Sequence, residues 1–73
     1  MRAIVLRFSS LGDVVLTEPL VRALSDRGYT VDFVTHDAYV PLVRACFPVA
    51  RAVTVERAAD LPAADLLVDL QNS

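Results

Sequence analysis

The sequence lacks the features that mark several large classes of protein. Its only cysteine, Cys46, leaves no intrachain disulfide and no paired-cysteine metal motif, and we expect it to be a small buried hydrophobic residue. No apolar run approaches the ~18 residues that a membrane-spanning helix requires. Met1-Arg2 leads directly into a short apolar segment, without the cleavage site of a signal peptide. These absences predict a cytoplasmic protein.

Lysine is also absent, so arginine supplies all seven basic residues, against nine acidic residues and a formal charge of −2. The arginines form no run along the chain. Proteins that bind nucleic acids concentrate basic side chains on one face to neutralise phosphates. We therefore expect no nucleic acid among the partners and, without paired cysteines, no metal site.

Apolar residues make up 55% of the chain and are arranged in short blocks. Continuous apolar blocks of this kind are typical of strands that are buried on both faces of a parallel sheet. We therefore expect strands at 3–8, 30–35, 52–55 and 66–70.

Two helical segments are expected between these strands. The first covers 13–27 and is kinked at Pro19. Thr17 could cap its second piece, and Gly28 would end it. The second helix begins near Asp37. The apolar positions of the first segment predict an inward stripe made of Val14, Val15, Leu16, Leu20, Val21, Ala23 and Leu24.

The order of the elements predicts an α/β fold with a Rossmann-like parallel sheet. Right-handed crossovers give the strand order 3-2-1-4. Both helices then cover the same face, and the connector at 56–65 is too short to cover the other face. A bare sheet face is rarely tolerated in water, and the chain ends at Asn72-Ser73, where another helix should follow. We therefore expect residues 1–73 to be an incomplete part of a larger protein.

The most informative motif is the turn Ser9-Ser10-Leu11-Gly12-Asp13, which follows the first strand. Ligands of open α/β sheets bind outside the carboxyl ends of the strands, so Asp13 stands where chemistry is usually done. Its charge repels phosphate, which points to a proton acceptor or an orienting group rather than a binding site for an anion. The alternative is a capping box, in which Ser10 caps the helix and the Asp13 side chain reaches back to the Ser10 amide.

Further candidate residues belong to this turn or precede it. Ser9 and Ser10 either shape the turn or contact a ligand directly. Gly12 allows a close approach of the backbone or a positive φ angle. Arg7 is either a paired surface arginine or a contact to a phosphate of the ligand.

Three more candidates follow other strands at the same edge of the sheet. Asp69 and Gln71, at the end of the fourth strand, either line a cleft beside Asp13 or only hydrogen-bond its turn. His36 follows the second strand, where a loop residue is the simpler interpretation than a catalytic histidine.

These residues together resemble the amino terminus of the ADP-heptose:lipopolysaccharide heptosyltransferases, glycosyltransferase family 9. That family opens with a strand, a Ser-Ser-x-Gly-Asp-Val turn and a helix with a Thr-x-Pro step. Residues 9–14 and Thr17-Glu18-Pro19 match these features. A later strand of the family ends in an Asp-Leu-Gln-like motif, matched here by Asp69-Leu70-Gln71. The resemblance covers essentially the whole chain, but only the first part of such an enzyme.

The resemblance implies a GT-B enzyme with two Rossmann-like domains facing each other across a cleft. The amino-terminal domain of such an enzyme binds the acceptor, a phosphorylated Kdo–lipid A core, and the carboxyl-terminal domain binds the ADP-heptose donor. The transfer inverts the anomeric centre without a metal ion or other cofactor, and the catalytic base maps onto Asp13. Residues 1–73 would then form the acceptor side and be inactive alone. A lipid-linked acceptor also implies peripheral contact with the inner membrane.

Two other functions remain open on the sequence. A dinucleotide-binding Rossmann module would use Asp32 or Asp37 as its ribose-binding acid. Its fingerprint requires three glycines in the first turn, however, and only Gly12 is present here. A non-catalytic interaction fragment would explain an exposed apolar face of the sheet.

Overall fold

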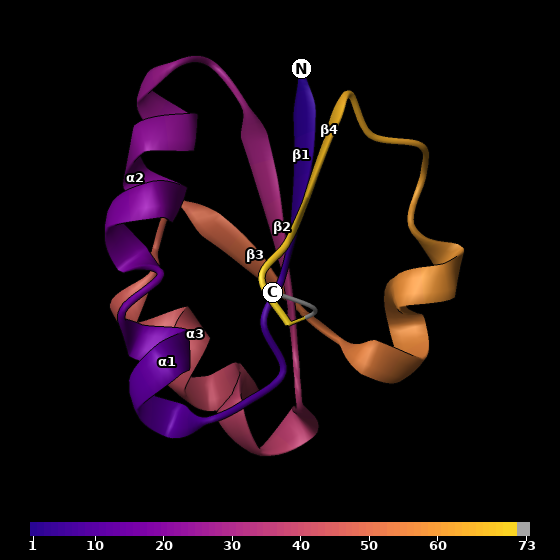
Figure 1. The fold of residues 1–73 in the computed structure, drawn as a ribbon. Helices are drawn as coiled ribbons and strands as arrows, with labels where there is room; N and C mark the ends of the chain where they lie inside the picture. The colour runs from indigo at the N-terminus through magenta and orange to yellow at the C-terminus, as the bar shows by residue number, and fades with distance from the viewer. Residues whose placement is uncertain (72–73) are drawn as a thin grey trace.

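Four short strands build the sheet in residues 1–71, the part of the chain that the computed structural model describes. They are β1 (Arg2–Leu6), β2 (Thr30–Thr35), β3 (Ala50–Thr54) and β4 (Leu66–Asp69). Every pairing is parallel, and the strand order is β3-β2-β1-β4 (Figure 1). The Rossmann-like α/β fold and the strand order expected from the sequence are therefore confirmed.

The α-helices of these residues cover one face of the sheet (Figure 1). They are α1 (Leu11–Val15), α2 (Glu18–Asp26) and α3 (Val40–Cys46), and a 3-10 turn, η1 (Asp37–Tyr39), leads into α3. Within residues 1–71, each helix falls short of the length and apolar content needed to cross a membrane.

The kink predicted in the first helical segment is a complete break between α1 and α2. Pro19 lies in the first turn of α2, where its missing N–H removes no helical hydrogen bond. Thr17 occupies the N-cap position, but its Oγ1 donates to the carbonyl oxygen of Val14 at 2.6 Å instead of capping α2. Gly28 follows α2 with a φ of +92°, the left-handed conformation that ends many helices.

The core lies between the sheet and the α-helices. The rings of Phe33 and Phe47 meet edge to face, with centroids 5.2 Å apart and an interplanar angle of 82°, which is a favourable geometry for aromatic pairs. These two rings belong to one cluster of buried residues, which consists of Ala3, Val5, Val14, Val21, Leu24, Val31, Phe33, Val43 and Phe47. This cluster holds the helices against β1 and β2.

Part of the inward stripe predicted for 13–27 is wrong. Leu16 is 76% exposed, and Val15 and Ala23 also lie at the surface. The break after Val15 explains the error, because the helical repeat restarts at Glu18 and apolar positions on either side of the break do not share one face. Cys46, which we expected to be buried, is exposed at the last position of α3.

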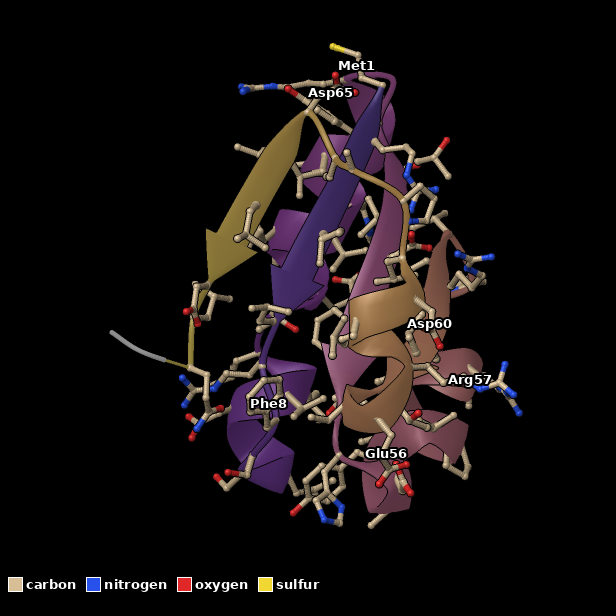
Figure 2. The ribbon with its side chains drawn as sticks, turned by 90° about the vertical axis from the view of Figure 1, so that its right-hand side faces the viewer. Met1, Phe8, Glu56, Arg57, Asp60 and Asp65 are labelled. Carbon is tan, nitrogen blue, oxygen red and sulfur yellow. The ribbon has the colours of Figure 1, made fainter. Side chains whose placement is uncertain are left out.

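The connector between β3 and β4 covers more of the sheet than the sequence suggested. Residues Val55–Asp60 form a 3-10 helix, η2, on the face opposite the α-helices (Figures 1 and 2). Its six residues span about 12 Å, which exceeds two strand spacings of about 4.8 Å. Val34 of β2 is buried on this face. The expectation of an entirely bare face is therefore wrong for the β2–β3 half of the sheet.

The β1–β4 half of the same face remains open, as expected. Leu67 pairs with Ile4 in the register of β1 and β4, and Leu67 is 61% exposed. The residues after β4 at which we expected a further helix, Asn72-Ser73, lie outside the described part of the chain.

The break between α1 and α2 predicts unequal effects for two leucines that the sequence alone treats as equivalent. Leu24→Ala, at a position 7% exposed, should lower the free energy of unfolding by about 2–5 kcal/mol. Leu16→Ala is the matched control and should change it by less than about 0.5 kcal/mol. Urea denaturation followed by circular dichroism measures both. Equal losses for the two variants would contradict the observed break.

Candidate functional site

The candidate site lies at the carboxyl edge of the sheet, where the chain leaves β1. The ladder between β1 and β4 continues past β4, because Leu70 donates its N–H to the carbonyl oxygen of Leu6 at 3.0 Å. On the other side, Arg7 donates its N–H to the carbonyl oxygen of Val34 at 3.1 Å. These bonds bring the turn after β1 next to the residues after β4, as the sequence predicts for Asp69 and the motif around it.

Asp13 is held through one of its two carboxylate oxygens. Its Oδ2 lies 2.9 Å from a terminal nitrogen of Arg7 and accepts hydrogen bonds from the Ser10 hydroxyl at 3.0 Å and the Ser10 N–H at 3.4 Å. Oδ1 has no partner among residues 1–71, and the side chain is 48% exposed. Ser10 and Asp13 therefore form the predicted capping box, and the same carboxylate keeps one oxygen accessible to a ligand.

The pKa of Asp13 is lowered, chiefly by the hydrogen bond from Arg7. The hydroxyl and the backbone N–H of Ser10 add to this effect, and so does the positive charge of Arg7. Both partners stabilise the ionised carboxylate, so Asp13 is charged at neutral pH. The pair supports folding above the ordinary pKa of an aspartate, and this support is lost as the pH falls through the lowered pKa.

Arg7 joins Asp13 to the end of β4. One terminal nitrogen of its guanidinium contacts Asp13, and the other donates to the carbonyl oxygen of Leu70. The side chain is largely buried, and its Nε finds no acceptor among residues 1–71. Arg7 is thus a paired arginine, the first of the two interpretations that the sequence left open. Its contact with a phosphate of the ligand stays a prediction.

Gln71 fastens the turn after β1. Its Oε1 accepts the N–H groups of Phe8 at 2.9 Å and of Ser9 at 3.4 Å. Its own N–H donates to Oδ1 of Asp69 at 3.1 Å. Of the two roles considered for this pair, Gln71 therefore hydrogen-bonds the turn, and Asp69 orients Gln71.

Of the two expectations for Gly12, the positive φ angle is wrong, and a close approach to its backbone stays a prediction. It is the second residue of α1, its φ is not positive, and no atom lies within 4 Å of the position that a Cβ would occupy. Ser9 is exposed beside Ser10 at the surface of the turn. Direct contact between these residues and a ligand stays a prediction.

Of the remaining sequence candidates, His36 and Asp32 have structural roles, and Asp37 is the first residue of η1. The Nδ1 atom of His36 accepts the N–H of Ala38 at 3.2 Å and caps η1, as expected for a loop residue. Asp32 lies inside β2 rather than after it, is 1% exposed, and forms ion pairs with Arg2 and Arg51. It is therefore not placed to bind a ribose at the carboxyl edge. Residues 1–71 also contain no group of three or more potential metal ligands.

Sequence reasoning missed the ion pair between Arg7 and Asp13. The signal was the pair of opposite charges that flank the turn between β1 and α1. Spacing alone does not show that the two side chains turn toward each other.

Removing the arginine should reverse the shift of the Asp13 pKa. In Arg7→Gln we expect that pKa to rise toward its ordinary value, because the main stabilising hydrogen bond is lost. Carbon-13 NMR titration of the Asp13 carboxyl measures it. Arg22→Gln is the control: it removes an arginine that pairs with Glu18 on α2 and should leave the titration unchanged. An unaltered Asp13 titration in Arg7→Gln would show that the ion pair is absent in solution.

Comparison of the chain with protein-family models, with curated proteins and with solved structures found no match in any of the three.

Proposed function

We propose that this chain forms the acceptor side of an inverting glycosyltransferase, with Asp13 as the general base. The observation that carries the proposal is that the two carboxylate oxygens of Asp13 have different environments. Oδ2 is fixed by Arg7 and Ser10, whereas Oδ1 has no partner among the described residues and the side chain is half exposed. The carboxylate stands at the carboxyl edge of a parallel sheet, where ligands of such folds bind.

The chemistry required of Asp13 is modest. An acceptor hydroxyl within about 3 Å of Oδ1 could hydrogen-bond to it and transfer its proton as the oxygen attacks the anomeric carbon. The bond from the sugar to the leaving nucleoside diphosphate breaks on the opposite face, which inverts the anomeric centre. The lowered pKa of Asp13 keeps the carboxylate deprotonated, and transfer can occur because it is concerted with the attack.

The identity of the substrates follows from the resemblance noted in the sequence. The proposed donor is ADP-heptose, bound mainly by a second domain in a GT-B arrangement, and the proposed acceptor is a phosphorylated, lipid-linked core of lipopolysaccharide. A lipid-linked acceptor would bring the enzyme to the cytoplasmic face of the inner membrane. On this proposal residues 1–73 alone do not catalyse the transfer, because the donor site lies in the second domain.

The dinucleotide-binding alternative finds less support in the site. A pyrophosphate at the amino end of α1 would meet the Asp13 carboxylate, which is ionised. Asp32, one of the two acids that could bind a ribose, is neutralised inside the sheet by Arg2 and Arg51. The charge of Asp13 favours a hydroxyl over an anion as the group that approaches it, and the pairing of Asp32 removes one of the two candidate ribose-binding acids.

The proposal predicts a large kinetic effect from a conservative change. In the complete enzyme, Asp13→Asn should lower heptose transfer from ADP-heptose to phosphorylated Kdo–lipid A by about 10²–10⁴-fold, because asparagine cannot accept the proton. Asp26→Asn, at the exposed end of α2, is the control and should leave the rate unchanged. Mass spectrometry of the acceptor measures transfer.

The Asp13→Asn variant also distinguishes a general base from a residue that only caps α1. A base predicts lost turnover with little change in the melting temperature. Preserved turnover together with a loss of about 0.5–2 kcal/mol of stability would reduce Asp13 to a helix cap and overturn the proposal.

A further inference from the structure

Away from Asp13, one cavity of about 720 Å³ opens between β3, α3 and η2. Its wall contains four arginines: Arg2 from β1, Arg44 from α3, Arg51 from β3 and Arg57 from η2. We call this set the arginine groove. Figure 2 shows η2 over this part of the sheet, with Arg57 and Asp60 labelled. The groove shares no residue with the site at Asp13.

The arginine groove is positively charged, although the chain as a whole is negatively charged. The chain carries −2 overall and has seven basic residues, and four of the seven line this one cavity. Asp60 is the only acidic residue on the described wall, and Asp32 lies behind Arg2 and Arg51. Four positive charges against these two negative charges leave the groove positive, which favours an anionic ligand.

Asp32 holds two of the arginines in place. Its Oδ1 accepts a hydrogen bond from Nε of Arg51 at 2.9 Å, and its Oδ2 accepts one from a terminal nitrogen of Arg2. Burying a carboxylate lowers the stability of a fold unless the carboxylate is paired. Even a paired one often stabilises a fold no more than an apolar residue in its place. We infer that Asp32 has a role besides stability: its two hydrogen bonds fix the orientation of both guanidinium groups in the absence of a ligand.

The arginine groove also offers more hydrogen-bond donors than the described residues can satisfy. Neither Arg44 nor Arg57 forms an ion pair or a side-chain hydrogen bond within residues 1–71. Arg51 engages Asp32 only through Nε, and its side chain is 62% exposed. The Nε of Arg2 is buried without an acceptor among these residues. Guanidinium groups in this condition match the oxygens of phosphoryl groups, which they bind in a bidentate manner.

We propose that the arginine groove binds a ligand with phosphoryl groups, either a soluble phosphorylated molecule or the headgroup of a lipid. Its volume falls within the range of small-ligand pockets, about 300–1,000 Å³, and exceeds the space of one phosphate. Arg44 and Arg57 approach from α3 and η2 respectively, so they can contact different phosphoryl groups of one ligand. This inference does not rest on the function proposed for Asp13.

The test uses the complete protein and the Nε–H resonance of Arg51, which reports on the groove alone. Inorganic pyrophosphate should shift this resonance in a saturable manner at physiological salt. The variant Arg44→Gln with Arg57→Gln should weaken the apparent affinity at least about tenfold, a loss of about 1.4 kcal/mol. The matched control, Arg22→Gln with Arg27→Gln on and after α2, removes the same charge elsewhere and should weaken it by less than about twofold.

The second arm of the test identifies the source of the phosphoryl group. Binding to phosphatidylcholine vesicles that contain phosphatidic acid, lost in the groove variant and kept in the control variant, assigns a lipid headgroup. Binding of pyrophosphate without vesicle binding assigns a soluble ligand. Equal weakening in the groove and control variants overturns the proposal, as does the absence of any Arg51 shift at about 10 mM pyrophosphate together with no vesicle binding. Circular dichroism confirms that both variants are folded.

Discussion

The parallel pairing of β1 with β2 on one side and β4 on the other is the constraint on which the site depends. Parallel strands end at one edge of the sheet, so the segments that leave β1 and β4 meet there. Gln71 then reaches the turn after β1, and the carbonyl group of Leu70 reaches Arg7. Arg7 in turn holds Asp13. Residues from the end of β4 therefore hold both Arg7 and the turn that carries Asp13.

Much of the fold could be predicted because local patterns and global topology agree. The apolar blocks located all four strands, and 30–35 coincides with β2. Right-handed crossovers then left one strand order. The errors lie where tertiary structure decides the outcome. Leu16 is exposed because the helix breaks beside it, and the residues of η2 carry no apolar periodicity that announces their packing on β2 and β3.

The positions of the candidate residues in the fold could be predicted from the sequence, but their contacts could not. The turn after the first strand pointed to Asp13, and the Asp-Leu-Gln ending pointed to Gln71. The sequence left each residue with two roles, however. The choice depended on side-chain directions: Asp13 caps α1 through one oxygen and exposes the other, and Gln71 fastens the turn. The cluster of four arginines could not be predicted for the same reason, because they lie between positions 2 and 57 of the chain and line one cavity only in the fold.

Because the chain has no lysine, every basic side chain that lines the arginine groove is a guanidinium group. A guanidinium group does not deprotonate at any pH at which a protein stays folded, so the four arginines of the groove keep their positive charges. A mildly acidic or mildly alkaline pH does not change these four charges. A phosphoryl monoester, by contrast, gains its second negative charge near pH 6. A change in binding near pH 6 is therefore expected from the phosphoryl group of the ligand and not from the four arginines.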